Sequence, residues 1–170
     1  MAVFQIGGPV LLVLVTVSVL RVFLDDKVRP EAPSEERGRA LFHHCFLAPD
    51  FVMYGIALLL SGEGIRALVA EMQAMSRPVG SHYSWFPFLI AMDIFILILS
   101  IVLWYRFGRG KAIPMIRSDD NMQEQQGAAT WMPDWRAGFF SREGFCTLVL
   151  GNFLGLVCVS SAVVYITRAP

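Results

Sequence analysis

Four long apolar stretches divide the chain, and polar residues are concentrated in the connections between them. Each stretch has the roughly 20 residues that a helix needs to cross a hydrocarbon core of about 30 Å. A bilayer core offers the backbone no hydrogen-bonding partner, so helix is the form that such a stretch adopts there. The pattern predicts an all-α fold, an integral membrane bundle of four transmembrane helices that forms a single domain over residues 1–170, with spans at about 3–24, 49–70, 84–105 and 145–167.

The second stretch is the least uniform of the four, because Glu63 and Arg66 interrupt it after a short apolar run. The distribution of Lys and Arg nevertheless favours a crossing at this point. These residues are frequent in and beside the first and third connections, and sparse in the second connection and at the C-terminus. Cytoplasmic connections of membrane proteins carry the excess of positive charge, so we expect connections 25–48 and 106–144 on the inner side. Both termini then lie on the non-cytoplasmic side, which requires four crossings.

The first connection contains the pattern of a short helix. Two prolines precede Ser34, which is placed to cap a helix that begins there. In such a helix Leu41, Phe42, Cys45 and Phe46 share one face. A helix with one apolar and one charged face is typical of the membrane surface, so we expect a short interfacial amphipathic helix before the second span.

The third connection is the longest and has two parts. The polar stretch 118–126 predicts a loop. It is followed by Trp131 and Trp135, and Trp is enriched at membrane–water interfaces because its ring is apolar and its N–H is polar. We expect these two residues to return the chain to the interface or to dock against another chain.

Composition narrows the class of protein. Only 16% of the residues are charged and 55% are hydrophobic, whereas soluble globular domains have roughly 25% charged residues. Lys and Arg, 14 residues, balance Asp and Glu, also 14, so the chain lacks the basic footprint of a protein that binds nucleic acid. These values argue against a soluble enzyme, a disordered chain and a nucleic-acid partner. They favour a multi-pass protein of a bacterial inner membrane or of a eukaryotic organelle or plasma membrane, in contact with membrane lipids.

Three charged residues fall inside the predicted spans, away from the span ends: Glu63, Arg66 and Asp93. Glu63 and Arg66 are three residues apart and share a helix face. Asp93 lies roughly 14 Å into the third span, at a depth compatible with theirs. Charges at such depths usually face the protein interior or water. Two interpretations remain open: a site for an ion, a proton or a ligand headgroup, or structural pairs whose side chains reach the headgroups.

The fourth span carries small residues at helical spacing. Gly151 and Gly155 stand four residues apart, which lets two helices approach closely, and a neighbouring asparagine is suited to hydrogen bonds across helices. The predicted packing or partner face consists of Thr147, Gly151, Asn152, Gly155, Cys158 and Ala162. The sequence leaves open whether this face meets the chain's own bundle or another subunit.

Neither a cofactor nor a metal site is predicted. His43, His44 and Cys45 are adjacent, but neighbouring histidines point in different directions on a helix, and no second group follows at a zinc spacing. The spans contain no histidine, which argues against a haem held between helices. Motifs of nucleophilic, nucleotide-dependent and zinc-dependent enzymes are absent from the sequence. A bound lipid is compatible with the composition.

These features favour a non-enzymatic accessory, structural or assembly subunit of a larger membrane complex, with other membrane subunits or further copies of the chain as partners. The first alternative is a small channel or transporter in which Glu63, Arg66 and Asp93 lie beside an aqueous path. It would be oligomeric, since four helices seldom enclose a pore. The second alternative is a membrane bundle that binds a lipid or hydrophobic ligand, or a membrane enzyme, with Glu63 or Asp93 at the end of a lipid-accessible cavity.

Overall fold

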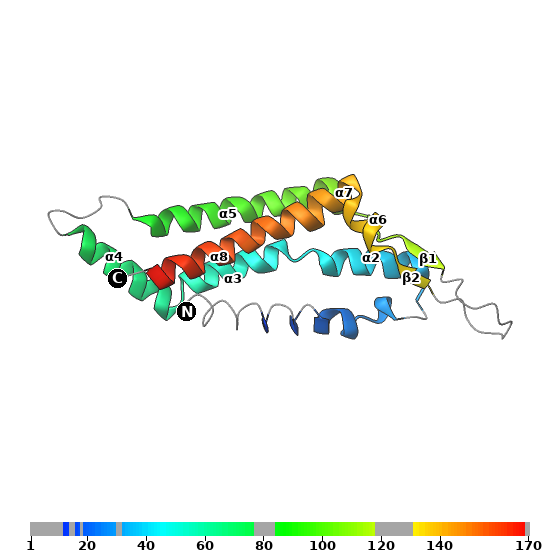
Figure 1. Cartoon of the computed structure of the whole chain (residues 1–170), viewed down its shortest axis with the longest axis horizontal. Helices are drawn as coiled ribbons and strands as arrows, with labels where there is room; N and C mark the ends of the chain where they lie inside the picture. Colours follow the sequence, from blue (N-terminus) through cyan, green and yellow to red (C-terminus); the bar gives the residue numbers. More distant parts are fainter. Residues whose placement is uncertain are drawn as a thin grey trace.

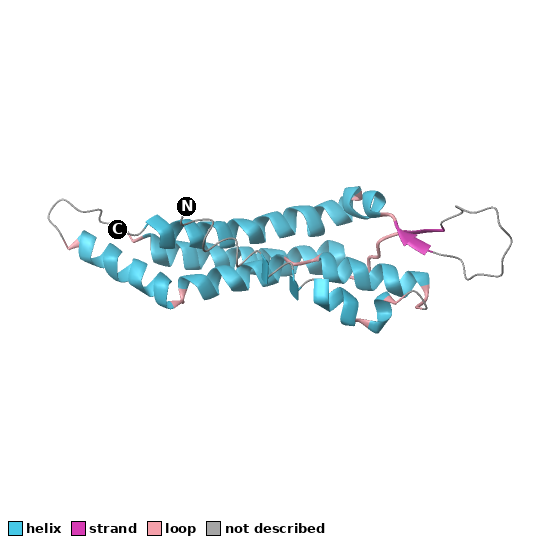
Figure 2. Cartoon of the chain, turned by 60° about the horizontal axis from the view of Figure 1, so that its bottom comes forward, coloured by secondary structure: helices cyan, strands magenta, loops and turns pink. Residues whose placement is uncertain are grey.

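Helices make up most of the structure, a computed structural model that describes residues 12–13, 16–17, 19–29, 32–76, 84–117 and 131–168. The elements after the N-terminal helical residues 19–24 are η1 (Asp26–Val28), α2 (Ser34–Cys45), α3 (Ala48–Leu59), α4 (Gly62–Met75), α5 (Trp85–Leu103), η2 (Trp104–Gly108), β1 (Met115–Arg117), β2 (Trp131–Pro133), α6 (Trp135–Phe140), α7 (Arg142–Gly144), η3 (Phe145–Gly151) and α8 (Asn152–Arg168). The π-helical segment η2 continues α5, and the π-helical segment η3 leads into α8. Figures 1 and 2 show an elongated bundle in which α3, α5 and α8 lie side by side, with α4 at one end and the strands, α6 and α7 at the other.

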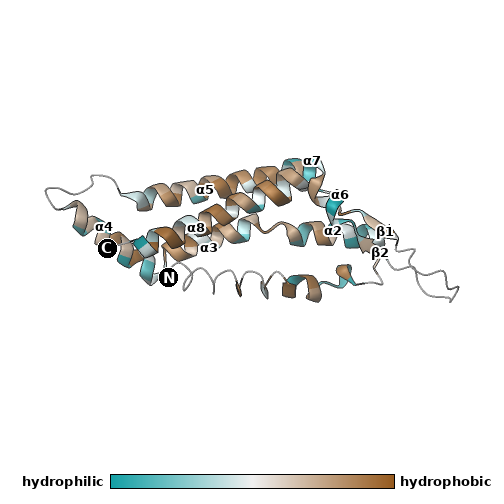
Figure 3. Ribbon diagram, viewed as in Figure 1, coloured by the Kyte–Doolittle hydropathy of each residue, from teal (hydrophilic) through white to brown (hydrophobic). Residues whose placement is uncertain are grey.

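Three helical runs of the described chain are long and apolar enough to cross a membrane: Ser34–Leu59, Trp85–Gly108 and Arg142–Arg168. Their length and composition indicate an integral multi-pass membrane protein. Hydrophobic residues predominate along α3, α5 and α8, and hydrophilic residues gather toward the two ends of the bundle (Figure 3). The first predicted span, 3–24, lies mostly outside the described residues.

The predicted second span, 49–70, is not a single helix. Helix α3 ends at Leu59, and α4 begins after Ser61, whose hydroxyl donates to the Leu58 carbonyl (2.6 Å) and accepts from the Gly64 N–H (3.3 Å). A serine that bonds the backbone locally competes with continuation of the helix. A Cβ atom on Gly64 would lie 2.0 Å from the Leu59 carbonyl oxygen, so a larger residue does not fit this turn. The helical run that meets the length and composition of a span here is Ser34–Leu59, which joins α3 to α2 rather than to α4.

The predicted helix of the first connection forms as α2, with two differences. Pro33 rather than Ser34 occupies the N-cap position, and no side chain caps the helix. The predicted apolar face packs against the rest of the chain, because the segment after α5 and the start of η3–α8 cover it. The core cluster at this end of the bundle consists of Leu41, Phe42, Ile113 and Leu148.

A short two-stranded sheet, which the all-α prediction did not include, lies in the third connection. Strand β1 pairs antiparallel with β2, and Ile116 stands opposite Met132. Strands of three residues are too short to show the alternation by which a strand is recognised in a sequence.

The most extensive helix contact is that of α3 with α8, and small residues line it. A Cβ atom on Gly155 would lie 2.8 Å from the Ala48 carbonyl oxygen and 2.9 Å from the Phe51 Cβ atom. A Cβ atom on Gly151 would lie 3.1 Å from the ring of Phe46. The two glycines therefore let the backbones approach closely, as small residues do between membrane helices.

We expect Gly155→Leu to destabilise the bundle by about 1–3 kcal/mol, the usual cost of forcing extra atoms into a packed core. Thermal unfolding in detergent measures the effect. Gly62→Leu is the matched control, because a Cβ atom on Gly62 meets nothing within 4 Å. Equal melting temperatures for the two variants would show that the α3–α8 approach does not limit stability.

Candidate functional site

A single side chain from α8 holds the break between α2 and α3. Asn152 Nδ2 donates a hydrogen bond to the Cys45 carbonyl (2.7 Å), and Asn152 Oδ1 accepts one from the Leu47 N–H (2.8 Å). Pro49 lies in the first turn of α3, where it lacks an N–H and disfavours helical geometry in the residue before it, so the helix does not run unbroken through this point. Unpaired backbone groups are costly in apolar surroundings, and the Asn152 amide satisfies one on each side of the break.

A pocket of about 440 Å³ lies beside this break, between the N-terminal helical residues, the α2–α3 junction and the end of α5. Its lining residues are Arg21, His43, His44, Phe46, Pro49, Asp50, Ile101 and Trp104. Ligand pockets typically have volumes of about 300–1,000 Å³ and apolar walls with a few convergent polar groups, and this pocket has both properties. We call it the junction pocket and treat it as the candidate functional site.

The charged groups that line the junction pocket form one ion pair. Arg21 donates to both carboxylate oxygens of Asp50, at 2.7 and 3.3 Å, and thereby joins the N-terminal helical residues to α3. The side chains remain 51% and 33% exposed. The pocket therefore presents a cation and an anion next to each other, with their formal charges balanced.

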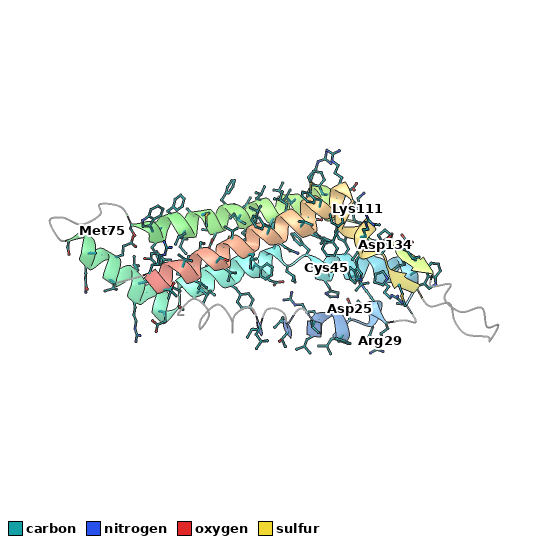
Figure 4. The ribbon with its side chains drawn as sticks, in the orientation of Figure 1. Asp25, Arg29, Cys45, Met75, Lys111 and Asp134 are labelled. Atoms are coloured by element: carbon teal, nitrogen blue, oxygen red, sulfur yellow. The ribbon has the colours of Figure 1, made fainter. Side chains whose placement is uncertain are left out.

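A second polar contact borders the pocket on the side of α2. His44 Nε2 lies 2.8 Å from Asp25 Oδ2, and Figure 4 shows Asp25 beside the end of α2 that carries Cys45. Hydrogen bonds from the Lys27 N–H and from His44 hold the pKa of Asp25 below its usual value. Asp25 therefore keeps its negative charge at neutral pH and holds His44 at the pocket wall.

Aromatic rings form the apolar wall of the pocket. Phe46 stacks on Trp104 with ring centroids 4.9 Å apart and 21° between the ring planes. His43 meets Trp104 edge-on, at 5.2 Å and 90°. Ile101 continues this wall along α5 and is 54% exposed. The wall therefore leads from the polar groups to the outer surface of α5.

The structure divides the predicted group of Glu63, Arg66 and Asp93 between two places. Arg66 Nη1 lies 3.0 Å from Glu63 Oε1 along α4, and the two side chains are 79% and 62% exposed. Asp93 is fully buried on α5, and within the described part of the chain neither of its oxygens has a hydrogen-bond partner. The break at Ser61 accounts for the separation, because α4 is a helix distinct from α3 and extends beyond the end of the bundle (Figure 1).

The small-residue face, which runs along η3 and α8, lies inside the chain's own bundle. Its buried members are Thr147, Gly151, Gly155, Cys158 and Ala162, and Asn152 is half-buried. They meet the end of α2, α3 and α5 through the contacts of the glycines, the hydrogen bonds of the asparagine and two core clusters.

The two tryptophans of the third connection lie at the end of the bundle that carries the strands. Trp131 is in β2, and Arg37 of α2 donates to its carbonyl. Trp135 begins α6, which Asp134 caps by accepting from the Ala137 N–H at 2.9 Å. Both tryptophans are exposed.

His43, His44 and Cys45 point to different partners. His43 packs on Trp104, and His44 bonds Asp25. Among the residues that the structure describes, no group of three or more His, Cys, Asp or Glu side chains is arranged to hold a metal ion.

Glu71 is the most connected polar residue of the opposite end, and sequence reasoning missed it. Its carboxylate accepts hydrogen bonds from the Trp85 N–H (2.6 Å), the Ser84 hydroxyl (3.0 Å) and the Tyr165 hydroxyl (2.7 Å). Glu71 thus caps the start of α5, where Ser84 makes no side-chain cap of its own, and fastens α4 to the end of α8. Burial opposes its charge, but these hydrogen bonds outweigh burial and place the pKa of Glu71 below its usual value. In the sequence Glu71 is only a charged residue just beyond an apolar stretch.

We expect Glu71→Gln to lower the free energy of unfolding by about 1–3 kcal/mol at neutral pH, because hydrogen bonds to a charged acceptor are replaced by weaker ones. A carboxylate whose folded-state pKa is lowered stabilises the fold above its unfolded pKa, and that contribution is lost as the pH falls through the folded pKa. The difference between wild type and variant should therefore shrink below about pH 4.

Thermal unfolding in detergent across this pH range measures the difference. Glu63→Gln on the same helix is the control, since its exposed pair with Arg66 contributes at most about 0.5 kcal/mol. A Glu71→Gln variant as stable as Glu63→Gln at pH 7 would contradict the capping role.

Comparison of the chain with protein-family models, with curated proteins and with solved structures found no match. The junction pocket, with its paired charges and aromatic wall, is the feature of the described chain from which we infer a function.

Proposed function

We propose that the protein binds a membrane phospholipid, with a zwitterionic headgroup in the junction pocket and an acyl chain against the outer surface of α5. The observation that carries this proposal is the Arg21–Asp50 pair in a pocket that is also lined by the stacked rings of Phe46 and Trp104 and by Ile101. The sequence-based alternative of a lipid-binding bundle thus moves to different residues, because neither Glu63 nor Asp93 is among those that line the pocket.

Charge complementarity favours a headgroup that carries both signs. A phosphoethanolamine head has a phosphate and an ammonium a few bonds apart. The Arg21 guanidinium suits the phosphate, since arginine binds phosphate oxygens through two parallel N–H groups. The Asp50 carboxylate suits the ammonium, since hydrogen bonds between opposite charges are the strong ones. A purely anionic head would meet the like charge of Asp50, and a purely cationic head would meet Arg21.

The outer surface of α5 offers a path for the acyl chain. Ile101 lines the pocket, and Ile98 and Ile94 precede it by three and seven residues, which places all three on one helix face. All three side chains are exposed. An apolar stripe that leads out of a polar pocket matches an amphiphile whose head and tail differ in this way.

A stability measurement tests the proposal. Phosphatidylethanolamine added to the detergent-purified protein should raise its melting temperature, because a ligand that binds the folded state stabilises it, by about 2.7 kcal/mol at a hundredfold excess over Kd. Phosphatidylglycerol, whose headgroup is anionic, should give a smaller rise at the same concentration.

Two arginine variants test whether the rise in melting temperature comes from lipid bound in the junction pocket. Arg21→Gln should abolish the rise caused by phosphatidylethanolamine. Arg29→Gln should keep it, because Arg29 forms an exposed pair with Asp26 and does not line the pocket. Equal rises in the two variants, or equal rises with both lipids, would refute a zwitterion site at Arg21.

We also propose the finer topology that the charge distribution predicts: four crossings, with both termini on the non-cytoplasmic side and residues 25–48 and 106–144 on the inner side. The excess of Lys and Arg in those two connections supports it. In this topology the second crossing begins with α3, so α2, whose first residues are charged, and the junction pocket at the α2–α3 break lie toward the inner surface of the membrane.

A second candidate function is the accessory or assembly role that the sequence favours, with another membrane subunit or a further copy of the chain as partner. Exposed apolar side chains gather in the third connection, on β2 and α6, beyond the long apolar runs: Trp131, Met132, Trp135 and Phe140. Exposed apolar groups at such a place are typical of contact surfaces. The face of α8 does not support this role, because it is used within the chain.

The mass of the protein extracted from its own membrane in mild detergent tests this candidate. We expect a complex larger than one chain, and we expect Trp131→Ala with Phe140→Ala to release the single chain. Trp85→Ala, which removes an exposed tryptophan at the other end of the bundle, should leave the complex intact. A wild-type protein that is monodisperse and alone would rule the role out.

A further inference from the structure

A carboxyl group in the middle of the bundle lacks the partners that its burial requires. Asp93 is 0% exposed and lies about 12 Å along α5 from Trp85, at a rise of 1.5 Å per residue. Among the residues that the structure describes, neither Oδ1 nor Oδ2 has a hydrogen-bond partner, and the polar group beside them is the weakly polar thiol of Cys158. Among the described residues Asp93 is the one fully buried acidic or basic side chain. It is not part of the junction pocket.

On α3 and α8, the described helices whose residues meet Asp93, the facing groups are apolar or small. From α3 the facing residue is Gly55, where a Cβ atom would lie 3.2 Å from Asp93 Oδ2 and 3.2 Å from the Cys158 Cβ atom. From α8 the facing group is Cys158, which is fully buried. Val52, Ile96 and Cys158 form the core cluster at this level.

Other charged or titratable groups of these helices are engaged away from Asp93. On α3, Asp50 pairs with Arg21, and Tyr54 also lies close enough to Arg21 to interact with its charge. At the end of α8, Tyr165 donates to Glu71, and Arg168 is exposed. Helix α5 has no second charged residue between Trp85 and Leu103. The thiol of Cys158 is therefore the titratable group that faces Asp93.

These surroundings decide whether the carboxyl group of Asp93 binds a proton or a metal ion. An ionised carboxylate without a partner is very costly in a dry apolar core, and the group takes up a proton instead. A metal ion would require several oxygen ligands within about 2–3 Å. The other buried oxygen without a partner, Ser100 Oγ, belongs to a residue seven positions along α5, roughly 10 Å away by helix rise. A proton requires no further ligand.

We propose that Asp93 is a proton-binding site in the membrane core, occupied at neutral pH while α3, α5 and α8 are packed together. The proton leaves the carboxyl oxygen for water only when these helices separate enough to admit it. Release of the proton and opening of the bundle are thus one linked step. This site is independent of lipid binding at the junction pocket.

Infrared spectroscopy of the full-length wild-type protein in lipid nanodiscs tests the proposal directly. A protonated carboxyl group has a carbonyl stretch that is separate from the bands of carboxylates, and labelling the aspartate carboxyl carbon with ¹³C shifts it. Ordinary aspartates, with pKa values near about 3.9, are ionised at pH 7. We expect one protonated-aspartate band at pH 7 that moves with the label. Absence of such a band in the labelled wild type would overturn the proposal.

Two variants test whether the infrared band belongs to Asp93 and whether its proton makes stability depend on pH. Asp93→Asn should remove it, and Glu63→Gln, on the exposed surface of α4, should leave it unchanged. The folded protein then holds a proton that the unfolded chain loses. The equilibrium constant for unfolding should therefore rise about tenfold per pH unit above the pH range in which an exposed aspartate ionises. The wild type should therefore show this extra dependence between pH 5 and 8 relative to Asp93→Asn, by about tenfold per pH unit. Equal pH dependence in the two proteins would also overturn the proposal, and the isotope experiment decides the matter if the variant does not fold.

Discussion

The close approach of α3 to α8 is the contact on which the rest of the bundle depends. It exists because Gly151, the last residue of η3, and Gly155 of α8 stand where side chains would meet Phe46 and the backbone at Ala48. At this spacing the Asn152 amide reaches backbone groups on both sides of the α2–α3 break. The same approach closes the core around Asp93, since Gly55 of α3 and Cys158 of α8 meet there. A wider spacing would leave the break unpaired and admit water to the core.

Interruptions of the long helices are tolerated because specific side chains replace the missing hydrogen bonds. The Asn152 amide does this at the α2–α3 break, Ser61 at the start of α4, and Glu71 at the start of α5. Two of the three side chains come from another helix, so the interruptions also tie the helices together. Apolar surroundings require this, because an unsatisfied backbone group there finds no water to replace its partner.

The sequence predicted the structure best where a long apolar run can only form a helix in the membrane. The predicted spans 84–105 and 145–167 correspond closely to the helical runs Trp85–Gly108 and Arg142–Arg168. The second predicted span is interrupted at Ser61, because one hydroxyl and a glycine turn act through local hydrogen bonds that a hydropathy pattern does not contain.

The polar sites were harder to predict, because they depend on partners that are distant in sequence. A charge inside an apolar run is visible, which is why Asp93 was recognised, but its separation from Arg66 follows only from the break in the helix. Arg21 and Asp50 are 29 positions apart, and Tyr165 and Glu71 are 94 apart. The two polar sites, at Asp50 and at Asp93, differ in the partners that their carboxyl groups already have. At the junction pocket Asp50 is paired and partly exposed, so a headgroup exchanges one set of polar contacts for another at small cost. Around Asp93 the described residues offer only the weakly polar thiol of Cys158, so the carboxyl group holds the smallest cation, a proton. Both sites thus follow from the same scarcity of polar groups in an apolar bundle.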